Sequence, residues 1–180
     1  MQVIHKSIEG LVEIIPTVYT DERGLFFETF HKNIFHQNGL PTEFLQDNQS
    51  FSKKGVVRGL HFQKEPFAQG KLVRVIVGRV LDIAVDIRPN SPTFGKHEVV
   101  ELDAQKNNLF YVPGGFAHGF VALEDTIFYY KCTNVYNKAA ERGIFWNDPA
   151  LNIDWQITNP IVSEKDQQLP MLEDFLKSPY

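Results

Sequence analysis

The chain has 180 residues, of which 43% are hydrophobic and 13% aromatic, and its formal net charge is −4. A chain of this length can bury roughly 70% of the surface that it exposes when unfolded, so it can hold a core without disulfides or metals. The acidic balance disfavours a nucleic-acid polymer as a partner, because such proteins use a positive field, and no run approaches the ~20 apolar residues of a membrane helix.

Short apolar segments separated by turn residues predict an all-β sandwich or barrel. In chain order, the predicted strands are 11–15, 25–30, 56–62, 72–77, 80–87, 97–102, 109–112, 116–123 and 127–136. We expect Gly78 to supply the positive φ of a type II′ turn, so that the strands on either side of it form a hairpin. Alternation after this turn predicts one core face, made of Leu81, Ile83, Val85 and Ile87.

Two short helices are predicted, at 33–38 and 171–176. In the second helix, the residues at helical spacing are Leu172, Phe175 and Leu176. No repeat or linker divides the chain, which predicts one domain over residues 1–180. The N-terminal segment has charges inside its apolar run and lacks a cleavage site, and Cys132 has no cysteine to pair with. These features predict a cytoplasmic protein without a secretory signal or an internal disulfide.

Polar residues interrupt the strands at 58–63 and 71–75. Strict alternation gives the first segment two faces, with Arg58, Leu60 and Phe62 on one and Gly59, His61 and Gln63 on the other. If His61, Gln63 and Lys71 point into a barrel, they are costly there unless they are hydrogen-bonded or serve a ligand. A solvated face is the alternative.

A Pro-x-Gly-x-x-His pattern at 113–118 turns the chain and aims the imidazole of His118 from the start of the next strand. Two histidines on β segments raise the question of a metal site, since imidazole is a common metal ligand. The ligand set argues against it, because Gln63 stands two positions after His61 and Glu65 lies in a predicted loop. The sequence therefore predicts no bound metal.

Tyrosines dominate the last predicted strand, where Tyr130 and Tyr136 share one face and Tyr129 and Lys131 share the other. An inward tyrosine is by default a core residue with a satisfied hydroxyl. It can also donate a proton, because a phenol with a pKa of about 10 is neutral at pH 7. The residues alone leave both interpretations open.

Several longer stretches carry a family resemblance. They are DERGLFFE (21–28), FLQDNQSFSKKGVVRGLHFQ (44–63), QGKLVRVIVGRVLDIAVDIRPNSPTFG (69–95), VPGGFAHGF (112–120), YKCTNVY (130–136), GIFWNDP (143–149) and SEKD (163–166). In this order they resemble the dTDP-4-dehydrorhamnose 3,5-epimerase family, isomerases of sugar nucleotides with a cupin-type jelly roll. The His-x-His pair and glutamate of metal-binding cupins are missing around His61, so the resemblance implies a site without metal or cofactor.

The family reaction inverts C3 and C5 of dTDP-4-dehydro-6-deoxy-D-glucose, giving dTDP-4-dehydro-L-rhamnose for dTDP-L-rhamnose biosynthesis. Both carbons flank the C4 ketone, so removal of either proton leaves an enolate on the C4 oxygen. The reaction needs a base, a positive group near that oxygen, and an acid on the opposite ring face. By resemblance, the catalytic residues are His61 as the base, Asp166 as its hydrogen-bond partner, Lys71 as the positive group and Tyr130 as the acid.

The resemblance also implies how the substrate is bound. Tyr136 would stack on the thymine, a kind of contact worth about 1–3 kcal/mol. Arg23 and Glu28 would reach the nucleotide from a neighbouring subunit, which implies a homodimer with a shared site. The full set of expected substrate-binding residues is Arg23, Glu28, Gln46, Asn48, Arg58, His118, Tyr136, Glu141 and Lys165.

Alternatives remain for the acid and for the function. Tyr129 is the alternative acid, because the segment before Lys131 is slightly shorter than the family's usual spacing. A mono-epimerase that inverts C3 or C5 alone could keep the same residues, and a 3,4-ketoisomerase shares the cupin scaffold. A non-catalytic sugar-nucleotide-binding cupin is disfavoured, because His61, Tyr130 and Asp166 are all present.

Overall fold

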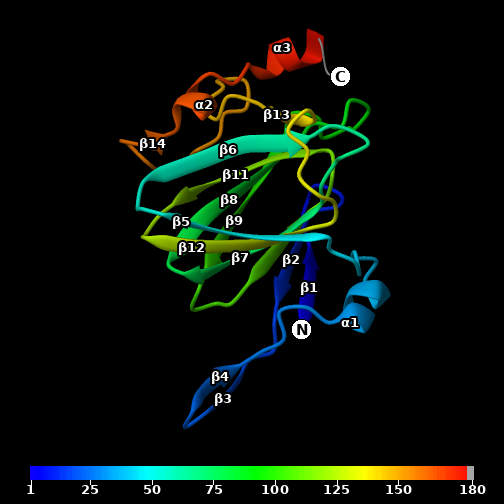
Figure 1. Cartoon of the computed structure of the whole chain (residues 1–180), viewed down its shortest axis with the longest axis vertical. Coiled ribbons are helices and arrows are strands. Elements are labelled where there is room, and N and C mark those ends of the chain that lie inside the picture. The colour runs from blue at the N-terminus through cyan, green and yellow to red at the C-terminus, as the bar shows by residue number, and fades with distance from the viewer. Residues whose placement is uncertain (178–180) are drawn as a thin grey trace.

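The computed structural model describes residues 1–177, with only the backbone of Leu176, and its strands form two facing sheets and a separate hairpin (Figure 1). The first sheet has the order β1 (Gln2–His5), β2 (Val12–Ile15), β10 (Leu109–Val112), β7 (Lys71–Val77), β12 (Thr126–Cys132) and β5 (Gln46–Ser52). The second has the order β13 (Glu141–Gly143), β6 (Val56–Gln63), β11 (Phe116–Ala122), β8 (Arg79–Asp86) and β9 (His97–Asp103), with β14 (Ile161–Val162) paired to β6. This arrangement confirms the predicted all-β jelly roll.

Inward-facing side chains from both sheets form an apolar core between them. They include Val73, Val75, Phe110 and Phe128 from the first sheet and Val80, Ala84, Val100 and Phe120 from the second. Phe120 and Phe128 stack across the sheets with ring centroids 4.3 Å apart. Each large side chain buried in this way stabilises the fold by about 1.5–3 kcal/mol.

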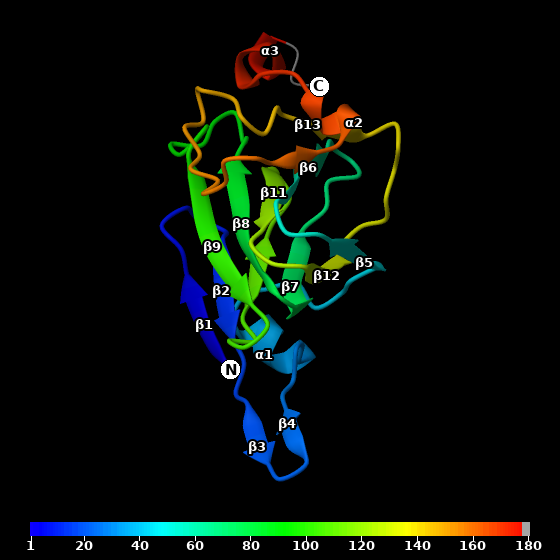
Figure 2. The same ribbon diagram turned by 90° about the vertical axis from the view of Figure 1, so that its left-hand side faces the viewer.

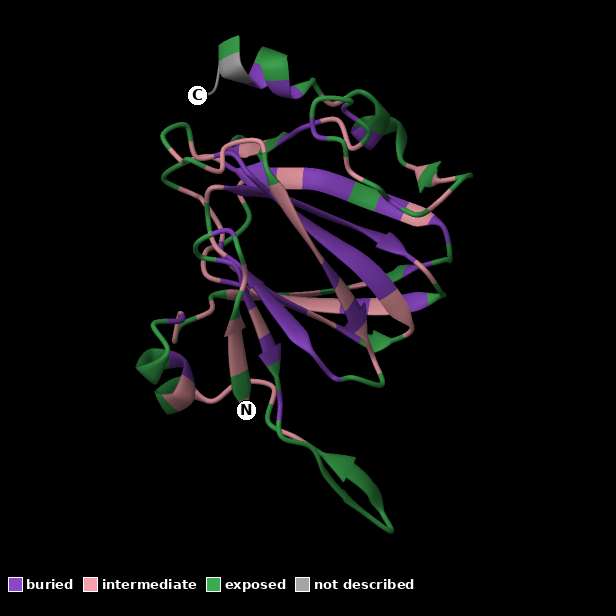
Figure 3. Ribbon diagram, turned by 180° about the vertical axis from the view of Figure 1, so that it is seen from behind, coloured by how far each residue is buried: buried purple, intermediate pink, exposed green. Residues whose placement is uncertain are grey.

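The outer face of the second sheet is also buried, because the C-terminal part of the chain covers it. The predicted core face of β8 packs there against Leu151, Trp155, Leu172 and Phe175, of which the last two lie on α3 (Leu172–Lys177). The predicted helix at 171–176 is thus confirmed, although the side chain of Leu176 lies outside the described residues. The opposite face of β8 is buried as well, so both faces of this strand are core (Figure 3).

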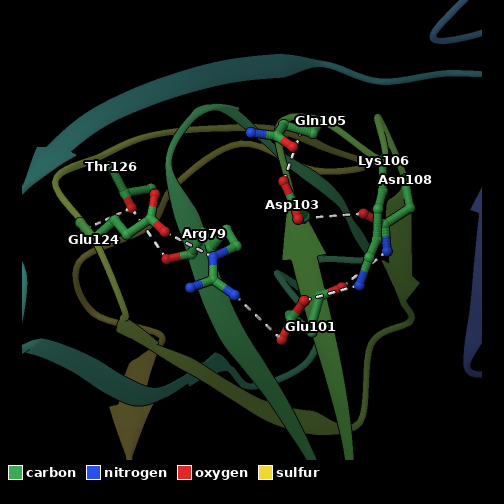
Figure 4. A network of polar contacts seen from close by, with 8 residues as sticks. All are labelled: Arg79, Glu101, Asp103, Gln105, Lys106, Asn108, Glu124 and Thr126. Carbon is green, nitrogen blue, oxygen red and sulfur yellow. Dashed lines mark hydrogen bonds and ion pairs between the residues drawn. The ribbon is translucent and has the colours of Figure 1, made fainter.

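The predicted hairpin around Gly78 is wrong. Gly78 has the expected positive φ of 83°, but β7 pairs with β10 and β12 while β8 pairs with β9 and β11. The glycine therefore carries the chain from one sheet to the other, and a Cβ there would overlap the carbonyl oxygen of Asp125. Polar contacts of Arg79 with Glu124 and Glu101 hold this corner (Figure 4).

Two peripheral elements extend from the sheets. The helix α1 (Lys32–Gln37) confirms the prediction at 33–38, and its buried Phe35 packs on the outer face of the first sheet. The hairpin of β3 (Tyr19–Asp21) and β4 (Gly24–Phe26) projects away from the body (Figures 1 and 2). The predicted strand at 25–30 is thus shorter than expected. No helix within residues 1–177 has the length and apolar character to cross a membrane.

Candidate active site

A β-bulge in β6 sets which side chains reach the interior. His118 on β11 pairs with His61, but Phe120 pairs with Arg58, so two residues of β6 oppose one of β11. A bulge of this kind re-aims the side chains on either side of it. Arg58 and His61 therefore both line the cavity, whereas Leu60 turns into the outer core. The predicted alternation, which put Arg58 with Leu60, is wrong at this point.

The imidazole of His61 is held by a buried carboxylate. Its Nε2 lies 2.7 Å from Oδ1 of Asp166, while Oδ2 accepts the backbone N–H of Gly59 at 3.2 Å. Burial opposes ionisation of Asp166, but these hydrogen bonds outweigh it and lower the pKa of Asp166. Because a carboxylate only accepts hydrogen bonds, Nε2 carries the proton and Nδ1 is left to receive one.

The position of Asp166 follows from its short helix, α2 (Glu164–Gln167). Ser163 caps this helix, and its hydroxyl accepts the backbone N–H of Asp166 at 3.1 Å. Ser, Thr, Asp and Asn are the residues that favour such a cap. The preceding strand β14 runs parallel to β6, which brings the cap beside His61. The SEKD segment thus delivers a carboxylate to a strand more than a hundred residues away in the chain.

A second imidazole is held in the same way. Nε2 of His118 lies 2.8 Å from Oδ1 of Asp82, and both side chains are buried. His61 and His118 are register partners, so the two pairs are neighbours on β6 and β11. Asp82 lies on the face of β8 opposite the predicted core face, and it was not among the predicted site residues. Its available signal was a carboxylate in the middle of an otherwise apolar strand.

Lys71 and Tyr130 face the histidines from the other sheet, on β7 and β12. Within residues 1–177 neither the Lys71 ammonium nor the Tyr130 hydroxyl has a hydrogen-bond partner. Burial lowers the pKa of Lys71, an effect that Cys132 and Asp82 partly offset. Burial raises the pKa of Tyr130, so its hydroxyl is protonated at neutral pH. Tyr129, in contrast, points to the outer face and donates to Asp47 at 2.9 Å.

These groups line a cavity of about 530 Å³ between the sheets, and a smaller pocket of about 290 Å³ adjoins it. His61, Lys71 and Tyr130 belong to the walls of both. Of the predicted residues, the larger space also contains Arg58, His118, Lys165 and Asp166, and the smaller contains Gln46, Asn48, Tyr136 and Glu141. A space of this size is typical of small-ligand sites.

A chain of polar contacts crosses the smaller pocket. The Tyr136 hydroxyl donates to Oε2 of Glu141 at 3.0 Å, and Nζ of Lys165 lies 2.7 Å from Oε1 of the same carboxylate. Burial opposes ionisation of Glu141, but these contacts outweigh it and lower the pKa of Glu141. The amide of Gln46 accepts the backbone N–H of Tyr136 at 2.7 Å and donates to Asn48 at 3.0 Å. The tyrosine itself is half exposed, so its ring is free to meet a ligand.

Two predicted residues do not reach this cavity within the chain. Arg23 sits in the β3–β4 hairpin, where its guanidinium pairs with Asp21. Glu28 is exposed just after β4. Figure 2 shows the hairpin extending away from the sheets that hold the cavity. Within residues 1–177, no group of three or more His, Cys, Asp or Glu side chains is arranged to hold a metal ion.

Comparison with known proteins adds independent information. The sequence profile for dTDP-4-dehydrorhamnose 3,5-epimerase matches residues 5–174. A dTDP-4-dehydrorhamnose 3,5-epimerase of Shigella flexneri is 51% identical over 168 residues, which cover 92% of this chain and 93% of that protein.

Solved structures agree with the sequence match. The crystal structure of dTDP-4-dehydrorhamnose 3,5-epimerase from Elizabethkingia anophelis has a TM-score of 0.92 and 48% identity, and the alignment covers 97% of each chain. An epimerase from Legionella pneumophila, solved in complex with dTDP-4-keto-L-rhamnose, has a TM-score of 0.91 and 43% identity, over 96% of this chain and 93% of that chain.

Proposed function

The chain belongs to the dTDP-4-dehydrorhamnose 3,5-epimerase family, and we propose that its cavity carries out the epimerisation with His61 as the base and Tyr130 as the acid. The protein is a 3,5-epimerase of dTDP-4-dehydro-6-deoxy-D-glucose in dTDP-L-rhamnose biosynthesis.

The observation that carries the proposal is that base and acid stand on different sheets. His61 is on β6 of one sheet and Tyr130 on β12 of the other, and both line the same cavity. A sugar ring held between the sheets presents one face to each of them. Removal of a proton from one face and delivery to the other inverts the carbon, which is what an epimerase must do.

Each inversion moves one proton off the sugar and one onto it. Nδ1 of His61 takes the proton from the carbon beside the ketone, and the electron pair of that C–H bond forms the enolate. Lys71 lies within the cavity to stabilise the negative charge on the C4 oxygen. Tyr130 then gives its proton to the carbon from the other face. The imidazolium loses its proton and the phenolate regains one by exchange with solvent before the second inversion.

The smaller pocket is suited to the nucleotide. Tyr136 offers a half-exposed ring for stacking on the base, and we assign Gln46, Asn48, Glu141 and Lys165 to the groups around it. Arg58 and His118 line the larger space, where they bind the sugar and its diphosphate. Arginine is well matched to phosphate oxygens because its planar fork donates two parallel hydrogen bonds.

We further propose a homodimer in which the β3–β4 hairpin of one subunit completes the site of the other. The hairpin exposes three large apolar side chains, Tyr19, Leu25 and Phe26, the first 64% and the last 65% exposed. Exposed apolar groups of this kind mark interaction sites. In a dimer, Arg23 and Glu28 would reach the partner's nucleotide. We also propose that residues 1–180 form one domain, and that it works in the cytoplasm, whose reducing conditions suit the free thiol of Cys132.

The proposed reaction is tested by incubating the purified protein with dTDP-4-dehydro-6-deoxy-D-glucose and determining the ring configuration by NMR. Inversion at both C3 and C5 supports the proposal. Inversion at one carbon only would identify a mono-epimerase, and binding without inversion would identify a non-catalytic cupin.

A further inference from the structure

Two carboxylates on β8, Asp82 and Asp86, are fully buried on the same face of the strand, but their surroundings differ. Both oxygens of Asp86 are bonded, to Arg88 and to the hydroxyls of Ser91 and Thr93. Asp82 has one bonded oxygen, because Oδ2 is buried without a hydrogen-bond partner within residues 1–177. An unpaired buried acceptor costs about 1–3 kcal/mol, so its presence calls for an explanation.

The surroundings of Asp82 connect it to the cavity. It lies among the apolar residues between the sheets, with Oδ1 bonded to Nε2 of His118, a wall residue of the cavity. Lys71, another wall residue, is close enough for its charge and that of Asp82 to influence each other. Burial raises the pKa of Asp82, and both His118 and Lys71 act against that rise.

We propose that Asp82 is a positioning residue for the epimerisation, which orients His118 toward the substrate and supplies the negative charge that balances Lys71. The inference rests on the proposed function, because it concerns the orientation of His118 and the charge of Lys71 during that reaction. Asp82 does not itself line the cavity and so does not touch the sugar. It acts through the two residues that do.

The role of His118 follows from its tautomer. With Nε2–H donated to Asp82, the ring is fixed and Nδ1 is the nitrogen left for the cavity. The role of Lys71 follows from charge balance. A buried ammonium loses its proton more easily, and a nearby carboxylate opposes that loss. Without Asp82, Lys71 would become neutral at a lower pH, and the enolate would lose its positive neighbour.

The titratable groups that act on Lys71, or line the same two spaces, come from several elements. They are Asp82 on β8, Cys132 and Tyr130 on β12, Glu141 on β13, His118 on β11, Arg58 and His61 on β6, Lys165 and Asp166 on α2, and Tyr136. Asp82→Asn alters only the first of these. The matched control is Asp86→Asn, which removes a buried carboxylate from the same face of the same strand but outside the cavity.

The experiment measures kcat and KM against pH for wild type, Asp82→Asn and Asp86→Asn, at a temperature where each is shown to be folded. We expect Asp82→Asn to lower kcat at least about tenfold and to move the alkaline limb of the kcat profile down by about one pH unit. Asp86→Asn should lower thermal stability and leave that limb in place. An unchanged limb in Asp82→Asn, with kcat within about twofold of wild type, overturns the inference.

A measurement on the wild type decides the matter if Asp82→Asn does not fold. ¹⁵N NMR of the His118 ring should find a proton on Nε2, and an Nε2 without a proton overturns the inference. The proposed function fails separately. If the wild type does not turn over dTDP-4-dehydro-6-deoxy-D-glucose, both the proposed function and the inference are wrong. If the wild type is active and Asp82→Asn has the same pH dependence of kcat, only the inference is wrong.

Discussion

His61 and His118 are register partners on β6 and β11, and each imidazole binds a buried carboxylate through Nε2. The two carboxylates differ in their position along the chain and in how many of their oxygens are hydrogen-bonded. Asp166 comes from a capped helix far along the chain and has both oxygens bonded, whereas Asp82 comes from the neighbouring strand and leaves Oδ2 unpaired. We assign proton transfer to the first pair and substrate orientation to the second.

Tyr130→Phe should separate proton exchange from inversion. The variant lacks the acidic hydroxyl, so the enolate can form at His61 but can be protonated only from the side of the base. In D₂O we expect deuterium to enter the sugar while inversion falls by about 10²–10⁴-fold, the usual contribution of a general acid. The control is Tyr129→Phe, whose hydroxyl contacts Asp47 on the outer face. Full inversion by Tyr130→Phe, with loss in Tyr129→Phe, would transfer the acid role to Tyr129.

Arg23→Ala tests whether the site is shared between subunits. Loss of a charged contact to the nucleotide should raise KM about tenfold or more with a smaller effect on kcat. The hairpin that carries Arg23 projects from the body, so the fold should be retained (Figure 3). Size-exclusion chromatography with light scattering should find a dimer.

A mixing experiment makes the same point without a kinetic model. Subunits of Arg23→Ala and of His61→Asn are unfolded together and refolded as mixed dimers. In a shared-site dimer, one site combines the intact His61 of the first chain with the intact Arg23 of the second, so activity at low substrate concentration rises above that of either variant alone. No rise would show that each hairpin serves its own chain.

Asp166→Asn should reveal the lowered pKa of Asp166 in the stability of the fold. Because the folded-state pKa lies below the unfolded value of about 3.9, the ionised carboxylate stabilises the fold above that pH, and the contribution is lost as the pH falls through the folded-state pKa. Urea unfolding should therefore give a free-energy gap between wild type and variant that is constant near neutral pH and narrows below about pH 4. A gap that does not change with pH contradicts this assignment.

A chelator should leave the activity unchanged. Each cavity imidazole already commits Nε2 to a carboxylate, and the amide of Gln63 is bonded to the backbone at Phe67 and Asn137. In the proposed mechanism, the positive charge of Lys71 performs the task that a Lewis acid would perform at the C4 oxygen. Turnover is measured after dialysis against EDTA and after Zn²⁺ is added back. Inactivation that Zn²⁺ reverses would establish a metal requirement.

The pattern of short apolar segments between turn residues was sufficient to predict most of the strands of both sheets. It failed for β5, whose inward residues Gln46, Asn48 and Ser50 line the site and so break the apolar pattern. It also failed at Gly78, because a positive φ allows a sheet-to-sheet corner as readily as a hairpin turn. Local sequence does not distinguish the two, since strand pairing is decided by the rest of the chain.

The family resemblance, rather than local rules, predicted most of the residues that the structure brings together around the cavity. Period-two alternation puts Arg58 and His61 on opposite faces, and only the bulge brings both into the cavity. Asp82 was not predicted as a site residue, because its contact with His118 forms only through the pairing of β8 with β11. Which residues meet at the cavity is decided by contacts between distant segments of the chain, and a short motif does not contain those contacts.

The most direct test follows solvent deuterium into the sugar. Wild type and His61→Asn are incubated with dTDP-4-dehydro-6-deoxy-D-glucose in D₂O, with His36→Asn on the exposed side of α1 as the matched control. Mass spectrometry and NMR then report deuterium at C3 and C5. We predict deuterium at both carbons with wild type and with His36→Asn, and at neither with a folded His61→Asn. Incorporation by His61→Asn at the wild-type rate would contradict the assignment of His61 as the base.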